Sequence, residues 1–275
     1  MSKVQAIVRL LRNRGPERQV SLRWLLHTGS RFDKEFALAK KHQVYPYGDF
    51  TRIEIDNQQF LWPRQAPLEP LLQILSELLT PDHPHQYLYG PTQLNANDVV
   101  LDIGASEGSF SVIAASRCKQ VIAVEPSHTM QTLIRSLFDL RNLPQPILVP
   151  CLLGSQPGSA YFLETPENPG AAHISDVSVS DTYEVAVRTL DDVVDSLELK
   201  PTFIKCDAEG AEQAILAGGI RFLQTCKPKL AITTYHNSDD YPRLYALLTS
   251  IGYRVMGKGF LFSHNALHVQ MLHAW

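Results

Sequence analysis

The chain of 275 residues lacks any long uninterrupted run of apolar residues. A membrane-spanning helix needs about 20 predominantly apolar residues, so the sequence predicts no transmembrane segment. Basic residues near the start are not followed by an apolar block and a small-residue cleavage site, and we therefore expect no secretory signal. The apolar fraction of 44% and the charged fraction of 19% are ordinary for a globular protein, which excludes disordered, collagen-like and coiled-coil chains.

Cysteine is scarce and dispersed. The four cysteines form no C-x-x-C pair; they are Cys118, Cys151, Cys206 and Cys226. This spacing disfavours a zinc knuckle, a disulfide framework and a thioredoxin-type motif. Separate thiols in a chain of this length are typical of a reducing compartment, so we expect a cytoplasmic location.

The net charge of −3 gives no strong attraction to nucleic acid, and we expect no nucleic-acid partner. The charge is nevertheless uneven. Residues 1–41 contain ten Lys or Arg and three Asp or Glu, so this segment carries +7 and the remainder −10. We expect a solvated basic helix over an acidic body, although such an arm could also touch RNA, a membrane surface or an acidic partner.

Residues 1–88 predict an N-terminal extension. The first forty residues show helical apolar spacing, and residues 53–62 alternate like a β-hairpin with a turn at Asp56-Asn57. Residues 67–79 place five leucines on one helical face. We expect this extension to contact the substrate or a second copy of the chain.

From Asp98 the pattern changes to short buried strands that alternate with helices. It predicts an α/β fold with a doubly wound, mostly parallel sheet covered on both faces over residues 89–275. The tail from Tyr253 predicts two strands without a helix between them, joined by a turn near Gly257 and Gly259, so the last strand should be antiparallel. Ligands of such sheets bind at the carboxyl ends of the strands.

A glycine loop follows the first of these strands and reads Asp102–Gly108. Small residues allow a ligand to approach the backbone, and the next helix offers free N–H groups at its start. Glu125 ends the following strand, where a nucleoside-binding sheet places a carboxylate for two ribose hydroxyls. Ser106 replaces a glycine of the dinucleotide fingerprint, and Asp102 would repel a pyrophosphate. The loop therefore favours S-adenosylmethionine, a sulfonium with an ammonium group, over NAD.

Two other classes of function remain open at this stage. Gly104–Gly108 also spells G-x-S-x-G, the nucleophile elbow of α/β-hydrolases, with Ser106 as nucleophile and Asp207 and His236 in the order of a triad. That elbow normally follows several sheet strands, whereas only a hairpin precedes this one, and it leaves Glu125 unexplained. The third class is a non-catalytic module that binds S-adenosylmethionine.

A second polar cluster lies at residues 204–212, which combine a lysine with three carboxylates at the end of a buried strand. Unpaired charge is costly there, so Lys205 should pair with one of the acids. We expect Asp207 to point into the ligand cleft with Glu209 beside it, and Glu212 to interact with the helix dipole.

These motifs together resemble the FkbM family of S-adenosylmethionine-dependent methyltransferases. The resemblance covers residues 89–253 and is strongest over Lys205–Glu212, which looks like the family's K-x-D-x-E-G-x-E signature. It implies a seven-stranded Rossmann-like class I methyltransferase fold and O-methylation of a hydroxyl on a small molecule or sugar. It also implies that Asp102–Gly108 hold the methionyl end of the cofactor and Glu125 its ribose. The full set of cofactor-binding residues that we expect is Asp102, Gly104, Ala105, Ser106, Glu107, Gly108, Phe110, Glu125, Pro126 and Asp207.

An alcohol acceptor benefits from a base within hydrogen-bond reach. We expect His236 to be this catalytic base, since it follows the fifth strand on the cleft side, with Asp207 and Glu209 as further catalytic candidates. The same residue types could bind a divalent metal, but the resemblance requires none, and we predict none. His83 and His85 lie in a proline-containing loop and are expected to be structural or exposed.

Overall fold

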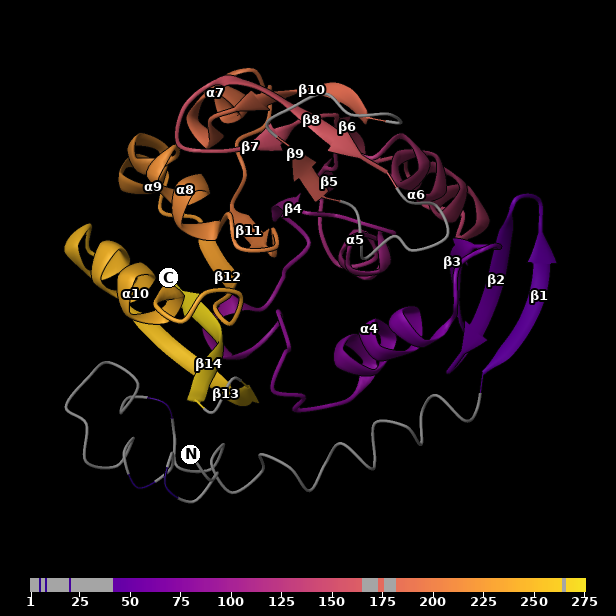
Figure 1. Cartoon of the computed structure of the whole chain (residues 1–275), viewed down its shortest axis with the longest axis horizontal. Coiled ribbons are helices and arrows are strands. Elements are labelled where there is room, and N and C mark those ends of the chain that lie inside the picture. The colour runs from indigo at the N-terminus through magenta and orange to yellow at the C-terminus, as the bar shows by residue number, and fades with distance from the viewer. Residues whose placement is uncertain are drawn as a thin grey trace.

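The computed structural model describes Gln5, Val8, Val20 and residues 42–164, 173–175, 182–263 and 266–275 (Figure 1). The helices predicted in the first forty residues therefore lie almost entirely outside the described residues.

A sheet of seven strands forms the centre of the molecule, in the order β13-β14-β12-β11-β4-β5-β6. The strands are β4 (Val99–Ile103), β5 (Gln120–Val124), β6 (Ile147–Val149), β11 (Phe203–Cys206), β12 (Lys229–Thr233), β13 (Val255–Ser263) and β14 (Ala266–Ala274). Only β14 runs antiparallel to its neighbours β12 and β13, while the other pairs of this sheet are parallel. The predicted mostly parallel sheet with an antiparallel last strand is confirmed.

Helices cover both faces of this sheet (Figure 1). One face carries α4 (Glu69–Leu79), α5 (Ser109–Ala115) and α6 (His128–Leu140). The other carries α7 (Leu190–Asp195), α8 (Glu212–Ala217), α9 (Ile220–Cys226) and α10 (Asp240–Ser250). Each set contributes its apolar stripe to one of two buried clusters, as expected for a doubly wound fold. The short α9, which begins directly after the glycine pair that ends α8, is not expected from the sequence.

Residues 43–63 form a three-stranded antiparallel sheet, β1 (Gln43–Tyr47), β2 (Phe50–Ile55) and β3 (Gln58–Pro63). The predicted hairpin is present, and Asp56 and Asn57 both adopt positive φ in its turn. Phe60 is fully buried in the same cluster as Leu133 and Val100, which belong to α6 and β4. The extension and the central sheet thus share one apolar core.

The described residues between 151 and 188 include four short strands, β7 (Leu152–Leu153), β8 (Gly158–Leu163), β9 (His173–Ser175) and β10 (Thr182–Arg188), in the order β7-β10-β8-β9. The short strands expected at 160–163 and 183–187 correspond to β8 and β10. The 3-10 turn η2 (Gly90–Thr92) leads from the extension into the central sheet.

The turn expected near Gly257 and Gly259 is wrong, because both residues lie inside β13. Gly257 pairs with Leu272 of β14, and beyond Gly259 the same register resumes with Phe260 opposite Val269. Their small size serves packing instead. A Cβ on Gly257 would lie 2.6 Å from the Tyr241 hydroxyl, and a Cβ on Gly259 would lie 2.7 Å from Pro84. The two glycines therefore let α10 and the loop before η2 approach this strand closely.

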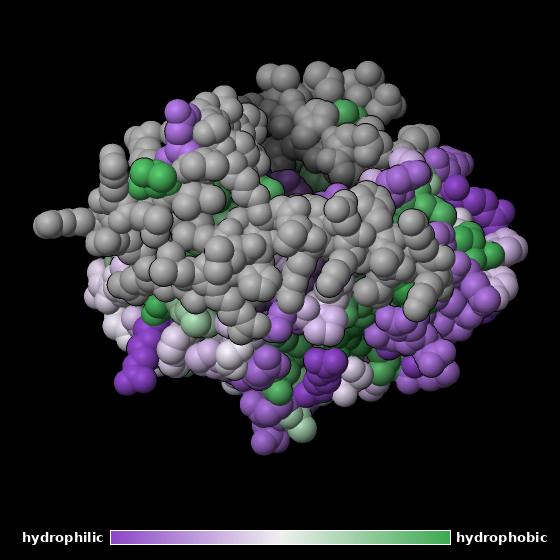
Figure 2. Space-filling model, turned by 90° about the horizontal axis from the view of Figure 1, so that it is seen from below, coloured by the Kyte–Doolittle hydropathy of each residue, from purple (hydrophilic) through white to green (hydrophobic). Residues whose placement is uncertain are grey.

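The described surface carries few large apolar side chains. Those classed as exposed are Val8, Val44 and Ile147, which come from three separate segments. In Figure 2, isolated hydrophobic residues stand among hydrophilic ones at the edge where Figure 1 places β1 to β3. Within the described ranges, no helix combines the length and the apolar character needed to span a bilayer.

Candidate active site

A cavity of about 620 Å³ opens at the carboxyl ends of β4, β5 and β11. This volume lies within the range of roughly 300–1,000 Å³ that is typical of small-molecule sites. The glycine loop and Glu125 line one part, and Asp207 and Glu209 line another. The parallel strands thus bring the two motifs of the sequence to one edge of the sheet, although about a hundred residues separate them along the chain.

Gly104 allows the two motifs to touch. Its φ is +70°, and a Cβ at this position would lie 2.0 Å from the carbonyl oxygen of Asp207. Only glycine combines this left-handed backbone with so close an approach. The Asp207 amide also donates to the carbonyl of Ile103 over 3.2 Å, which fixes the cluster after β11 against the end of β4.

Glu125 is held by backbone amides on both of its oxygens. The Ser106 amide donates to Oε2 over 2.8 Å, and the Ser127 amide donates to Oε1 over 2.9 Å. The residue is 6% exposed. Burial raises the pKa of this carboxyl to about 7, and the two amides only partly oppose that effect. Glu125 therefore pins the glycine loop to the end of β5 and lines the cavity.

Asp102 lies below the cavity and is not among its lining residues. It is fully buried and pairs with the Lys205 ammonium over 3.0 Å, while the Ser111 hydroxyl donates to it over 2.6 Å. Lys205 also donates to the carbonyls of Ile103 and Gly104, over 3.2 Å and 2.5 Å. Burial lowers the pKa of Lys205, but the carboxylates of Asp102 and Asp207 outweigh it and raise the net pKa. The predicted pairing of Lys205 with an acid is present.

Asp207 receives hydrogen bonds on both oxygens. The Tyr87 hydroxyl donates to Oδ2 over 2.5 Å, and the Thr233 hydroxyl donates to Oδ1 over 3.1 Å. Burial raises the pKa of this carboxyl, but the charges of Lys205 and His85 lower it more. Asp207 therefore stands ionised in the wall of the cavity, available to a cationic or hydroxylic ligand.

His236, the predicted base, pairs with acids through both ring nitrogens. Its Nδ1 lies 3.0 Å from Glu212 Oε1, and its Nε2 lies 3.6 Å from Glu209 and 3.7 Å from Asp207. Burial lowers the pKa of His236, but Glu212 and the other two carboxylates raise it to about 9. It is not among the lining residues of the cavity.

One group of acid and imidazole ligands could hold a metal ion. Asp207, Glu212 and His236 each bring one ligand atom within 4.8 Å of the others. In this arrangement the imidazole already hydrogen bonds to Glu212, whose Oε1 also accepts from the Ala208 amide over 2.8 Å.

Sequence analysis missed the contribution of the extension to the cavity. His85, from the loop before η2, is 3% exposed and buried rather than displayed on a surface loop. Its Nδ1 lies 2.6 Å from Glu77 Oε2, an acid of α4, and its Nε2 lies 3.5 Å from the Tyr235 hydroxyl. Glu77, His85, Tyr87 and Tyr235 all line the cavity. No local motif marks these residues, because their contacts span up to 150 residues of chain.

Most of the predicted cofactor-binding residues do line the cavity. Those that line it are Gly104, Ala105, Ser106, Glu107, Phe110, Glu125, Pro126 and Asp207. Asp102 and Gly108 do not; Gly108 instead starts α5 with a φ of +82° and faces Ile134.

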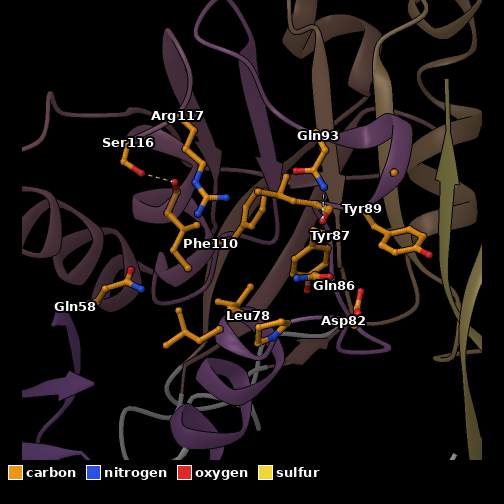
Figure 3. A pocket seen from close by; sticks show the side chains of 15 residues that line it. Gln58, Leu78, Asp82, Gln86, Tyr87, Tyr89, Gln93, Phe110, Ser116 and Arg117 are labelled. Atoms are coloured by element: carbon orange, nitrogen blue, oxygen red, sulfur yellow. Dashed lines mark hydrogen bonds between the residues drawn. The ribbon is translucent and has the colours of Figure 1, made fainter. Parts of the chain in front are cut away.

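A second cavity of about 600 Å³ lies on the other side of Tyr87 and Phe110. These two residues and Leu78 line both cavities and so separate them. Figure 3 shows Leu78 and Tyr87 below this second cavity, with Gln93 and Arg117 above it.

Comparison with known proteins identifies the family. A family model described as the Methyltransferase FkbM domain matches residues 102–255, which include the glycine loop, Glu125 and the cluster after β11. A search of curated proteins found no match.

Among solved structures, the chain resembles methyltransferase FkbM from Methylobacillus flagellatus KT, with 23% identity and a TM-score of 0.49 over 77% of this chain. It spans 56% of the length of that protein. It also resembles a precorrin-6y C5,15-methyltransferase from Geobacter metallireducens GS-15 (18% identity, TM-score 0.41, 66% of this chain and 81% of that chain). A Streptococcus mutans protein solved in complex with SAH is similar as well (11% identity, TM-score 0.43, 66% and 90%).

The family match covers more than half of the residues of the chain. The chain belongs to the FkbM methyltransferase family.

Proposed function

We propose that this methyltransferase uses S-adenosylmethionine to methylate a hydroxyl group of a small molecule or glycan. The observation that carries the proposal is Glu125, a buried carboxylate fixed by the Ser106 and Ser127 amides at the edge of the cavity. Each carboxylate oxygen has two lone pairs and accepts one backbone hydrogen bond here. The lone pairs that remain can accept hydrogen bonds from the two hydroxyls of a ribose.

The glycine loop and the strand end after β11 fit the rest of such a cofactor. Glu107 and Asp207 place negative charge in the cavity, which suits a ligand that carries an ammonium and a sulfonium. When bound, S-adenosylmethionine supplies an activated methyl group. The protein then has to align donor and acceptor, an effect worth roughly 7–11 kcal/mol in well-oriented reactions. We propose that Asp207 positions the reacting groups, with Glu209 at the rim and His236 orienting Asp207.

The serine hydrolase alternative has less support. It needs Ser106 to hydrogen bond to His236, but both nitrogens of His236 face carboxylates in the structure. The Ser106 amide donates a hydrogen bond to Glu125, a contact that a nucleophile elbow does not require. The non-catalytic binding module remains a distinct outcome of the experiment below.

The first experiment is calorimetric titration of the full chain with S-adenosylmethionine, S-adenosylhomocysteine and NAD. We expect micromolar binding of the first two and none of NAD. Replacement of Glu125 by Gln should weaken binding about 10- to 100-fold, since hydrogen bonds to a charged group contribute roughly 1.5–3 kcal/mol. Glu184→Gln on the exposed side of β10 is the matched control and should bind normally.

The pH dependence of binding adds a second criterion. Because the pKa of Glu125 is raised to about 7, deprotonation between pH 6 and pH 8 should strengthen cofactor binding up to about tenfold in the unmodified protein and not in Glu125→Gln. Methyl uptake from labelled cofactor is then screened over hydroxylated small molecules and glycans. Binding without formation of S-adenosylhomocysteine in any reaction would favour the non-catalytic module, and absence of cofactor binding would contradict the proposal.

A further inference from the structure

The wall of the cavity contains a histidine–carboxylate pair that comes entirely from the N-terminal extension. Glu77 lies on α4 and His85 on the loop that follows it. Glu77 Oε2 lies 2.6 Å from His85 Nδ1. The negative charge beside this nitrogen favours the tautomer with the proton on Nδ1, which leaves Nε2 as the atom that can accept a proton.

The free side of this imidazole faces the cavity. His85 Nε2 lies 3.9 Å from Asp207 Oδ2 and 3.5 Å from the Tyr235 hydroxyl. The Tyr87 ring packs against it edge-on with centroids 5.1 Å apart. A hydroxyl group that enters between Asp207 and Tyr235 would therefore meet Nε2.

The other candidates for a base are less suited to the task. His236 is not among the residues that line the cavity; its Nδ1 contacts Glu212, and its Nε2 lies behind the carboxylates of Asp207 and Glu209 at 3.7 Å and 3.6 Å. Asp207 already accepts from Tyr87 and Thr233. The side chain of Glu209 is 90% exposed and lies at the rim.

We propose that His85 is the general base of methyl transfer and that Glu77 is its positioning residue. This inference rests on the proposed function. In the reaction, the acceptor oxygen forms a bond to the methyl carbon while the carbon–sulfur bond breaks and its electron pair stays on sulfur. The hydroxyl proton passes to His85 Nε2, and the resulting imidazolium is stabilised by Glu77. The products are the methyl ether, neutral S-adenosylhomocysteine and a protonated histidine that returns its proton to solvent.

The charges around His85 determine its protonation before the cofactor binds. It is faced by Glu77 from α4, by Lys205 and Asp207 from β11 and the residue after it, and by the Tyr235 hydroxyl. The Tyr87 ring packs against it, and the His83 ring accepts a hydrogen bond from its backbone amide. Burial lowers the pKa of His85, but Glu77 and Asp207 outweigh burial and Lys205 and raise the net pKa. A sulfonium placed in the cavity adds positive charge, so the bound cofactor should lower this pKa and free Nε2 to accept a proton.

NMR titration of histidine Cε1–H signals tests the geometry without any acceptor. The His85 signal is assigned by its loss in His85→Gln. We expect S-adenosylmethionine to lower the His85 pKa by more than S-adenosylhomocysteine does, since only the former carries the sulfonium. Glu77→Gln should lower the pKa in the free protein, whereas Glu69→Gln, an exposed position on the same helix, should leave it unchanged.

Activity on an acceptor identified by the methyl-uptake screen gives the second readout. His85→Gln should reduce kcat by about 10²- to 10⁴-fold, the usual range for loss of a general base, with unchanged affinity for S-adenosylhomocysteine. Glu77→Gln should move the acidic limb of the kcat/KM profile to lower pH.

The failures of the two proposals are distinguishable. If S-adenosylmethionine binds and the pKa of His85 is the same as in the complex with S-adenosylhomocysteine, another group is the base and only this inference is wrong. The same conclusion follows if His85→Gln retains full kcat. If S-adenosylmethionine does not bind at all, the proposed function itself falls.

Discussion

A buried ion pair, Asp102 of β4 and Lys205 of β11, links the glycine loop to the cluster that follows β11. Asp102 is 0% exposed and Lys205 is 4% exposed. Desolvation of two such charges offsets much of their attraction, so the pair contributes little net stability by itself. The pair instead fixes the geometry of the site. The Lys205 ammonium also donates to the carbonyls of Ile103 and Gly104 and so holds the glycine loop beside Asp207.

At the same scale, the prediction that Glu125 and Asp207 face a ligand follows from the position of an acid immediately after a buried strand. His85 could not be found this way. Its role depends on Glu77, eight residues earlier, and on Asp207, more than a hundred residues later. A histidine between prolines has no periodic neighbour, so the sequence favours an exposed loop where the structure buries the residue.

His236 gives a prediction about pH and stability. Its pKa is about 6.5 in the unfolded chain and is raised to about 9 in the folded protein by Glu212 and its neighbours. A raised pKa contributes stability that is fully present below pH 6.5 and is lost as the pH rises through 9. At ~1.4 kcal/mol per pKa unit, the rise from about 6.5 to about 9 corresponds to about 3 kcal/mol at pH 6, which is the stability that His236→Gln should lose there.

The measurement is urea unfolding of both proteins at pH 6 and pH 10. The difference in free energy of unfolding should shrink at the higher pH, because His236 is then neutral in the folded and unfolded states alike. A difference that is equal at both values would show that His236 contributes packing only.

At the scale of elements, the local signals gave most of the boundaries correctly. Ser127 caps α6 by accepting a hydrogen bond from the Met130 amide, as its position after a strand and Pro126 predicts. The turn at Asp56-Asn57 joins β2 to β3 as expected. The failures at α9 and at the glycines of β13 have a common cause, because contacts with distant segments decide these features rather than local pattern.

Gly259 gives a prediction at this scale. Its φ is +73°, and a Cβ would lie 2.7 Å from Pro84, which directly precedes His85. Gly259→Ala should destabilise the protein by roughly 1–3 kcal/mol, from overpacking together with backbone strain. It should also reduce methyl transfer, because the loop that carries His85 must move.

Gly158→Ala on β8 is the matched control for this substitution, since a Cβ there would meet nothing within 4 Å. Thermal unfolding and the His85 NMR signal measure both effects. If Gly259→Ala unfolds like the control and leaves the His85 signal in place, the close approach of β13 and Pro84 has no role in the site.

For the whole molecule, the sequence alone correctly predicted the layered α/β architecture, since alternating strands and helices leave few arrangements. The sequence could not show where the N-terminal extension packs against the sheet, because an alternating apolar pattern does not reveal which surface of the protein its apolar side chains cover. The structure places Phe60, Trp62 and Leu71 in one buried cluster with residues of β4 and α6. Asp207 is also tied to Tyr87 across the division expected at residue 88.

This shared core leads to a prediction about cooperativity. Phe60 is fully buried beside α6, with the Arg141 guanidinium 5.8 Å from its ring centroid. Phe60→Ala should cost about 3–5 kcal/mol through lost burial and the cavity that remains. If residues 42–88 and 89–275 form one cooperative unit, the substitution must lower the stability of the central sheet as well as that of the hairpin.

Hydrogen exchange at intermediate denaturant concentration measures this directly. The amides of β4 and β11 should lose protection by the same free energy as those of β3 in Phe60→Ala. Exchange that accelerates in β1 to β3 alone, with β4 unchanged, would instead mean that the extension opens as a separate unit. In that case, cofactor binding should persist, because the glycine loop and Glu125 belong to the central sheet. His85 and Glu77 should leave the cavity, because both belong to the extension.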